Sequence, residues 1–217
     1  MTQRHIDCHN HLAEVWSQNP EKALTWLKTS AEQGIFFHMQ GGIGPQNWEH
    51  QIQLKNLYPS QVGLCFGLHP YWVAENTETD CELALDQLSK KLADKTQSPR
   101  ALGEIGLDLR PQIAKNSTEL QIRMLELQLE MLGWFKIPAV LHMVRCFPEA
   151  QRVFDFWGDF KLQGLVHSFN GPWEQAKYWI KKGFLISVGG PACYEKNQKL
   201  RKTLKEIPLE HLLLETD

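Results

Sequence analysis

The chain has 217 residues, of which 42% are hydrophobic and 22% charged, and its formal net charge at pH 7 is −2. This length suits a single domain over residues 1–217, and the near-neutral charge argues against a broad basic surface that grips long nucleic acid. A small anionic substrate held by metal ions is still compatible, because the net charge does not count bound cations.

The number and spacing of the cysteines and the absence of long apolar runs indicate the cellular compartment in which the protein is expected. The five cysteines are an odd number and form no C-x-x-C pair, so neither a disulfide framework nor a structural zinc knuckle is expected. The N-terminal residues are polar and show no signal-peptide pattern, and no apolar run is long enough to span a membrane. We therefore expect a cytoplasmic protein that does not enter a membrane.

Eight short apolar runs recur along the chain, separated by longer stretches. Nearly continuous apolar runs of this length are typical of strands that are covered on both faces. The predicted strands are His5–His9, Gly34–Gln40, Val62–Gly67, Ala101–Leu107, Pro138–Met143, Gly164–Phe169, Gly183–Gly189 and His211–Asp217.

Amphipathic stretches fill the seven intervals. The first predicted helix has Asn19 as its cap and Pro20 as its first residue, and a long helix is expected to be capped by Ser117. A further helix opens at Pro172. The remaining predicted helices are Asn47–Tyr58, Thr79–Asp94, Glu149–Trp157 and Glu195–Glu206.

Strict alternation of strand and helix predicts a parallel sheet, and eight repeats favour a closed (β/α)8 TIM barrel over an open doubly wound sheet. No G-x-G-x-x-G follows the first strand, which disfavours a dinucleotide fold. The sequence ends at Asp217 without an eighth helix, so the expected barrel is C-terminally incomplete. We expect apolar surface to be exposed where that helix would pack.

Metal-competent side chains stand at the ends of these strands. His9 and His11 are two residues apart, so in a strand their side chains point to the same face. Later strands end in His69, Glu104, His142, His167 and Asp217. Each residue alone is more often an ordinary core or surface group. Together, at the carboxyl ends of one barrel, they favour a divalent metal site, because such groups are unfavourable to bury without a cation.

The ordered motifs resemble the TatD-related metal-dependent hydrolase (deoxyribonuclease) family of the amidohydrolase superfamily. The resemblance extends over nearly the whole chain. Its motifs are Asp7-x-His9-x-His11, Gly67-x-His69-Pro70, Gly103-Glu104-Ile105-Gly106-Leu107-Asp108, the strand with His142, His167-x-Phe169-x-Gly171, and Leu213-Leu214-Glu215-Thr216-Asp217.

The resemblance implies a barrel with up to two or three divalent ions and 3′→5′ exodeoxyribonuclease activity. By position, one metal would be held by His9, His11, Glu104 and Asp217, and the second by Glu104, His142 and His167. His69 would contact the substrate phosphate. The family's His-x-Arg pattern is one residue longer here, so whether Arg145 also faces a phosphate is left open.

The expected mechanism is two-metal hydrolysis of a phosphodiester, at DNA ends or a small nucleic acid, by a metal-bridging hydroxide. Glu104 would bridge the metals, and Asp217 would orient the water and accept its proton. Oxygen and imidazole ligands fit magnesium, manganese or zinc. Two alternatives are an ester, lactone or aminoacyl-RNA hydrolase that uses the same site, and a non-catalytic truncated barrel. Asp7 is either an acceptor for a ligand N–H or an ordinary buried polar residue.

Overall fold

The structure is a computed structural model in which residues 4–157 and 162–217 are described. Parallel strands alternate with helices along this part of the chain, as the apolar runs predict. The strands are β1 His5–Asn10, β2 Ile35–Gln40, β3 Val62–Gly63, β4 Cys65–Phe66, β5 Ala101–Asp108, β6 Ala139–Val144, β7 Gly164–Val166, β8 Phe184–Val188 and β9 Leu212–Leu214.

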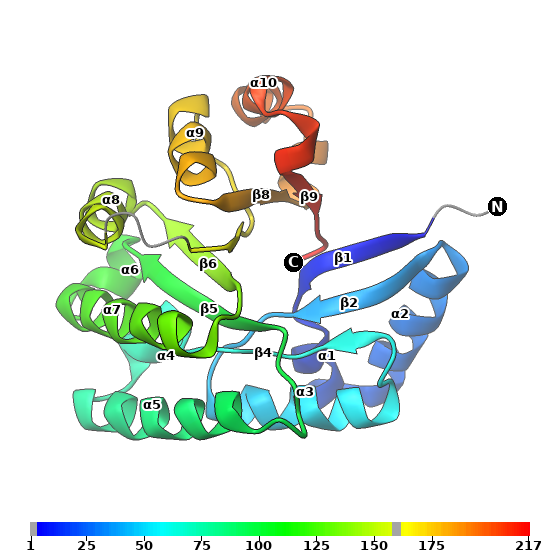
Figure 1. Cartoon of the computed structure of the whole chain (residues 1–217). Coiled ribbons are helices and arrows are strands. Elements are labelled where there is room, and N and C mark those ends of the chain that lie inside the picture. Colours follow the sequence, from blue (N-terminus) through cyan, green and yellow to red (C-terminus); the bar gives the residue numbers. More distant parts are fainter. Residues whose placement is uncertain (1–3, 158–161) are drawn as a thin grey trace.

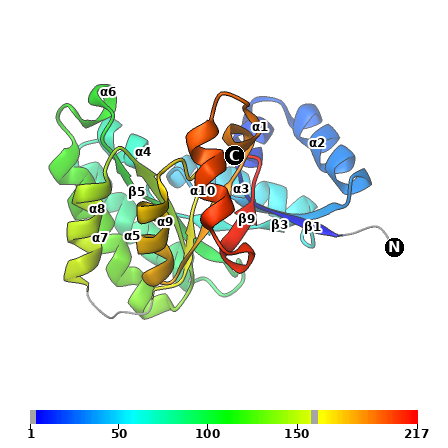
Figure 2. The same ribbon diagram turned by 90° about the horizontal axis from the view of Figure 1, so that it is seen from above.

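Helices cover the outside of the strands (Figure 1). Seen from above, α8, α9 and α10 follow one another around that outer face (Figure 2). The helices are α1 Leu12–Gln18, α2 Pro20–Glu32, α3 Pro45–Leu57, α4 Pro70–Glu75, α5 Glu78–Ala93, α6 Pro111–Ala114, α7 Thr118–Phe135, α8 Phe147–Phe156, α9 Trp173–Lys181 and α10 Gln198–Glu206. Two short 3-10 turns, Gly190–Cys193 and Leu209–His211, complete the described elements.

The strands pair in two runs, β1-β2-β3 and β4-β5-β6-β7-β8-β9. The predicted strand Val62–Gly67 is therefore divided, with β3 pairing to β2 and β4 pairing to β5. The side chain of Gln51, from α3, explains the division. Its Oε1 accepts from Cys65 N at 2.9 Å, and its Nε2 donates to the carbonyls of Cys65 and Gly41 at 2.8 and 3.1 Å. An amide thus occupies backbone groups of Cys65 that a continuous ladder would use.

The ring closes between the first strand and the segment after the last. Asp217 N donates to His9 O at 3.1 Å, and Figure 1 shows the C-terminal end beside β1. Ile6 and Leu214, on the two strands at this seam, are 53% and 68% exposed. With β3 and β4 taken as one interrupted strand, the predicted (β/α)8 barrel is confirmed.

Side chains from successive strands fill the barrel. A small buried cluster takes one residue from each of five strands: Cys8, Cys65, Ala101, Val140 and Leu165. A second, larger apolar cluster lies between the strands and the outer helices and includes Trp48, Phe66 and Trp179. Burial on both faces is what the nearly continuous apolar runs predict. No helix in the described part of the chain is both long and apolar enough to cross a bilayer.

The predicted helix starts are correct at Asn19 and less accurate elsewhere. Asn19 Oδ1 accepts from Lys22 N, which caps α2 as expected. Ser117 precedes α7, but its hydroxyl donates to Ile113 O, so the predicted side-chain cap is wrong. Pro172 is the residue before α9, not its first.

Three short helices, α1, α4 and α6, directly follow strand ends and were not predicted. The signal for α4 is Pro70 in its first turn.

Candidate metal centre

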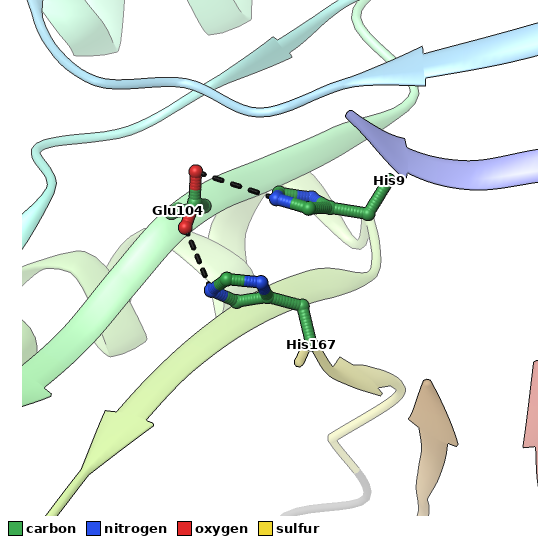
Figure 3. Close-up of side chains that lie close together, drawn as sticks. All are labelled: His9, Glu104 and His167. Carbon is green, nitrogen blue, oxygen red and sulfur yellow. Dashed lines mark ion pairs between the residues drawn. The ribbon is translucent and has the colours of Figure 1, made fainter. Parts of the chain in front are cut away.

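Seven side chains predicted as metal ligands or substrate contacts meet at the carboxyl ends of the strands. They come from β1, β5 and β6, from the segments that follow β7 and β9, and from the caps of α1 and α4. They are His9, His11, His69, Glu104, His142, His167 and Asp217. Figure 3 shows Glu104 facing His9, from β1, and His167, which follows β7; the two candidate ligands are far apart in the sequence.

The fully buried carboxylate of Glu104 divides the histidines into two groups. Its Oε1 lies 3.1 Å from His11 Nε2 and 3.5 Å from His9 Nε2. Its Oε2 lies 2.8 Å from His167 Nε2, 3.4 Å from His142 Nδ1 and 3.5 Å from His69 Nε2. The two carboxylate oxygens therefore face different sets of imidazoles.

Asp217 borders the same centre from the opposite side of the seam. Its Oδ1 lies 3.5 Å from His11 Nε2, 3.8 Å from His9 Nε2 and 3.9 Å from His167 Nδ1. The donor atoms of His9, His11 and Asp217 all lie within 4.8 Å of one another, as do those of His9, Glu104 and His167. Both sets have a spacing that a single cation could span.

Orphaned polar atoms show that these residues fit a cation. Both ring nitrogens of His9, both oxygens of Glu104, and Nδ1 of His11 and of His167 are buried without a hydrogen-bond partner among the described residues. Buried polar groups are normally paired, and burying them unpaired is unfavourable. Gly41 keeps the space clear: a Cβ at this position would lie 2.5 Å from Glu104 Oε1. The donor set and the space it leaves suit a divalent cation.

The electrostatics keep the carboxylates charged and two imidazoles neutral. Burial alone would raise the pKa of Glu104, but the surrounding histidines, His167 first among them, hold it well below its usual range. The contact with His11 likewise lowers the pKa of Asp217. Burial lowers the pKa of His9 and of His69 to about 4, so both are neutral at neutral pH. Neutral imidazole and ionised carboxylate are the forms that bind metals.

Hydrogen bonds to the outer nitrogens fix which atom of each imidazole faces the centre. His142 Nε2 lies 3.1 Å from Asp108 Oδ2 and donates to it, so the neutral ring, which is the form that binds a metal, has its lone pair on Nδ1. His69 Nδ1 accepts from Tyr71 N at 3.0 Å, so neutral His69 carries its proton on Nε2. His142 therefore presents a lone pair to the centre, whereas His69 presents an N–H.

Four residues around the centre were given no role from the sequence: Asp108, Arg110, Tyr71 and Glu215. Asp108 is fully buried and accepts from His142 and Arg110. Glu215 accepts from Ser168 N and Ser187 Oγ, and burial raises its pKa to about 7. The position of Asp108 at the end of a strand was the one available signal.

The structure shows the contacts of Asp7 and the position of Arg145, which the sequence left open. Asp7 accepts no imidazole N–H from His9 or His11. Instead it accepts from Thr216 N at 3.0 Å and Thr216 Oγ1 at 2.6 Å. Arg145 is exposed just after β6 and is absent from the described pocket lining.

A pocket of about 450 Å³ opens over the centre. Glu104, His142 and Asp217 form part of its lining, and Arg110 and Tyr71 complete one wall. The volume suits a small ligand or the end of a longer one. The site thus combines buried candidate metal ligands with an opening that substrate can enter.

Comparisons with known proteins agree with this description. The family model for TatD related DNase matches residues 6–217. A protein of Haemophilus influenzae named "Uncharacterized metal-dependent hydrolase" is 31% identical and covers 98% of this chain and 80% of its own length. A Pantoea vagans protein named "3'-5' ssDNA/RNA exonuclease TatD" is 28% identical over 88% of this chain and 71% of its own length.

Solved structures match the whole described fold. The crystal structure of the TatD homologue YjjV from Escherichia coli superposes with a TM-score of 0.85 at 28% identity, over 100% of this chain and 80% of that one. A TatD family hydrolase from Entamoeba histolytica has the same fold, with a TM-score of 0.84 over 100% of this chain and 74% of that one, at 22% identity. The chain therefore belongs to the TatD-related DNase family and is a metal-dependent hydrolase.

Proposed function

We propose that this protein is a phosphodiesterase that removes nucleotides from the 3′ end of DNA or of a small nucleic acid, with two divalent cations as cofactors. The observation that carries the proposal is the buried Glu104 carboxylate, whose Oε1 faces His9 and His11 and whose Oε2 faces His142, His167 and His69. The name of the Pantoea vagans relative supports this choice of reaction and substrate.

Each oxygen of Glu104 defines one proposed cation site. In this proposal His9, His11 and Asp217 would complete the Oε1 side, and His142 and His167 would complete the Oε2 side. Imidazole and carboxylate donors without cysteine suit magnesium, manganese or zinc. When bound, a pair of such cations makes water more acidic and neutralises charge on phosphoryl oxygens.

The charge of the site favours an anionic substrate. Glu104 and Asp217 contribute two negative charges, whereas two divalent cations contribute four positive ones. With both cations bound, the site would carry an excess of positive charge at the pocket and would attract a phosphodiester more strongly than a neutral ester.

Two side chains are placed to act on the reacting groups. Asp217 is ionised and lies at the pocket wall, where its carboxylate can orient the attacking water and accept a proton from it. His69 also lines the pocket, and its Nε2–H, which lies 3.2 Å from His142 Nδ1, is proposed to donate to a phosphoryl oxygen as charge develops there. A protonated Nε2 cannot ligate a cation, so this tautomer fits a substrate contact.

The test combines metal content with product analysis. Wild-type protein, loaded in turn with magnesium, manganese and zinc, is incubated with single-stranded DNA labelled at its 5′ end. We expect a ladder that shortens from the 3′ end, and we expect Glu104→Gln and His9→Asn to lose both bound metal and activity. His5→Asn is the matched control, because exposed His5 starts the same strand as His9.

The same assay carries a substrate comparison. If the metal-loaded protein cleaves p-nitrophenyl acetate but neither the DNA nor bis(p-nitrophenyl) phosphate, it is a carboxyl-ester hydrolase and the proposal is wrong. If it binds no divalent metal, the cofactor assignment is wrong as well.

A further inference from the structure

Arg110 is a cation in the pocket wall whose position is fixed before any substrate arrives. It lies two residues after the end of β5 and is the cap residue of α6. Its Nε lies 3.0 and 3.1 Å from the two oxygens of Asp108, and its Nη2 lies 2.9 Å from Asp108 Oδ2. A forked contact with a fully buried carboxylate restricts the guanidinium to one orientation.

Tyr71 supports the guanidinium from a second direction. The guanidinium carbon of Arg110 lies 5.1 Å from the centre of the Tyr71 ring, within the range of a cation–π contact. Tyr71 itself packs edge-on against His69, with ring centres 4.7 Å apart. Both Arg110 and Tyr71 line the pocket over the candidate metal centre.

The contacts of Arg110 leave one nitrogen of its guanidinium group, Nη1, available for a ligand. Nε and Nη2 serve Asp108, and no hydrogen bond or ion pair within the described part of the chain uses Nη1. The Arg110 side chain is 33% exposed. A partly desolvated guanidinium with a free N–H group, facing a pocket, is suited to an anionic oxygen.

Asp108 connects this cation to the metal centre. The same Oδ2 that accepts from Arg110 Nη2 also lies 3.1 Å from His142 Nε2. The Asp108 carboxylate therefore fixes the positions of Arg110 and the candidate ligand His142 relative to each other. This fixes the position of the guanidinium relative to the candidate metal centre.

We propose that Arg110 binds a second phosphate of the nucleic acid, adjacent to the one that is hydrolysed. This inference rests on the proposed function, in which His69 and the cations hold the reacting phosphate. Arg110 then sets a requirement for substrate length, because a substrate with a single phosphate cannot reach it while reacting. The sequence-based candidate for a phosphate contact, Arg145, lies outside the described pocket lining.

The test compares a substrate that has neighbouring phosphates with one that has none. For Arg110→Ala we expect KM for a thymidine tetranucleotide to rise about 10- to 100-fold, the effect of losing one charge-assisted hydrogen bond, with little change in kcat. KM for bis(p-nitrophenyl) phosphate should stay at the wild-type value. Arg152→Ala is the control, because Arg152 is 75% exposed on α8 and does not line the pocket.

A conservative variant distinguishes loss of a phosphate contact from a folding defect. Arg110→Ala leaves the buried Asp108 without its cation, so thermal denaturation and bound-metal content are measured for every variant. Arg110→Lys keeps a charge beside Asp108 but loses the fork, and we expect it to restore folding and metal content while leaving KM for the tetranucleotide elevated. Equal increases of KM for both substrates in Arg110→Lys would contradict the inference.

A binding measurement separates this inference from the proposed function. Fluorescence anisotropy of the metal-loaded protein with a labelled, cleavage-resistant phosphorothioate tetranucleotide reports binding without turnover. We expect Arg110→Lys to weaken binding, and Arg110→Ala to lower the slope of log affinity against log salt by about 0.7, the contribution of one phosphate contact to a single strand. If the wild type hydrolyses neither substrate, the proposed function is wrong. The difference in affinity between wild type and the Arg110 variants still shows whether Arg110 binds a phosphate. Unchanged binding in both Arg110 variants, or a loss in Arg145→Ala instead, would overturn the assignment.

Discussion

At the scale of single residues, the centre depends on which nitrogen of each histidine carries a proton. Asp108 sets this for His142 by accepting from Nε2, and the backbone N–H of Tyr71 sets it for His69 by donating to Nδ1. One imidazole becomes a candidate ligand and its neighbour a candidate donor to substrate, although the two nitrogens that face each other lie only 3.2 Å apart. Hydrogen bonds behind the rings thus assign different chemistry to the same residue type.

Replacement of Asp108 by Asn tests this control. Donors from Arg110 and His142 approach both oxygens of Asp108, so an amide nitrogen in either position opposes a donor. We expect Asp108→Asn to weaken divalent-metal affinity about 10- to 100-fold, measured by competition with a chelating dye. Asp86→Asn, on the exposed face of α5, should bind metal like the wild type. Wild-type affinity in Asp108→Asn would show that the tautomer of His142 is set by something else.

Gly41 tests whether the space within the centre is essential. A Cβ there would lie 2.5 Å from Glu104 Oε1 and 2.7 Å from Cε1 of both His9 and His11. We therefore expect Gly41→Ala to abolish metal binding, seen as loss of metal in elemental analysis of a folded protein. At Gly190 the nearest atom to an added Cβ is 4.0 Å away, so Gly190→Ala should keep its metal. Full metal content in Gly41→Ala would mean that the donor atoms of Glu104, His9 and His11 are not the ones used.

At the scale of elements, Asp7 joins the first strand to the segment after the last. It accepts from Thr216 N, Thr216 Oγ1 and Asn10 Nδ2 at 3.0, 2.6 and 2.9 Å. Removing a buried, charged acceptor leaves these donors unpaired, so Asp7→Ala should lower the free energy of unfolding by about 2–3 kcal/mol in urea denaturation. Thr216→Val, which removes a single hydroxyl donor, should have a smaller effect.

The difference in free energy of unfolding between wild type and Asp7→Ala should depend on pH, which gives a second test of the role of Asp7. Burial opposes the charge on Asp7, but the contacts with His38, Thr216 and Asn10 outweigh it and hold the pKa of Asp7 below its ordinary value of 3.8. A group whose pKa is lowered by folding stabilises the protein above its unfolded pKa, and this contribution is lost as the pH falls through the folded value. The gap between wild type and Asp7→Ala should therefore be constant above about pH 5 and narrow below pH 3.8. A gap that stays constant down to acid unfolding would exclude the charge of Asp7 as its cause.

The order of the elements and most of the candidate site could be predicted from the sequence. Each apolar run marks a strand, and the carboxyl ends of parallel strands must meet, so residues as distant as His9 and Asp217 could be placed together. The division of Val62–Gly67 could not be predicted, because it depends on the side chain of Gln51 reaching Cys65 from a neighbouring helix.

The residues missed at the site share one physical property. Each acts through a side-chain contact that depends on the tertiary fold: Asp108 contacts His142 of the adjacent strand, 34 residues along the chain, and Arg110 contacts Asp108 and the ring of Tyr71. Periodicity reports the face of an element and not the rotamer or the partner of a side chain. Arg145 is a candidate phosphate contact because it lies three residues after His142 in the sequence. That spacing could not show the backbone conformation of Arg145, which is left-handed with φ of 52°.

At the scale of the whole molecule, the centre joins strands that the ladder does not connect. Its candidate ligands come from β1, β5, β6 and the segments after β7 and β9, which includes both sides of the seam. Without a cation, the buried atoms of His9 and Glu104 have no hydrogen-bond partner among the described residues. A bound cation should therefore stabilise the closed ring and not only serve the chemistry.

Metal removal should consequently lower the melting temperature. A ligand present at 100 times its Kd stabilises the native state by about 2.7 kcal/mol, which for a chain of this size is a shift of roughly 5–10 °C. We expect calorimetry to show this decrease after EDTA treatment and recovery when the divalent metal is restored. Glu104→Gln, which loses the shared carboxylate, should melt at the same temperature with and without metal. If EDTA leaves the wild-type transition unchanged while abolishing activity, the cations contribute to catalysis alone, and the seam is held by Asp7 and the backbone contact between Asp217 and His9.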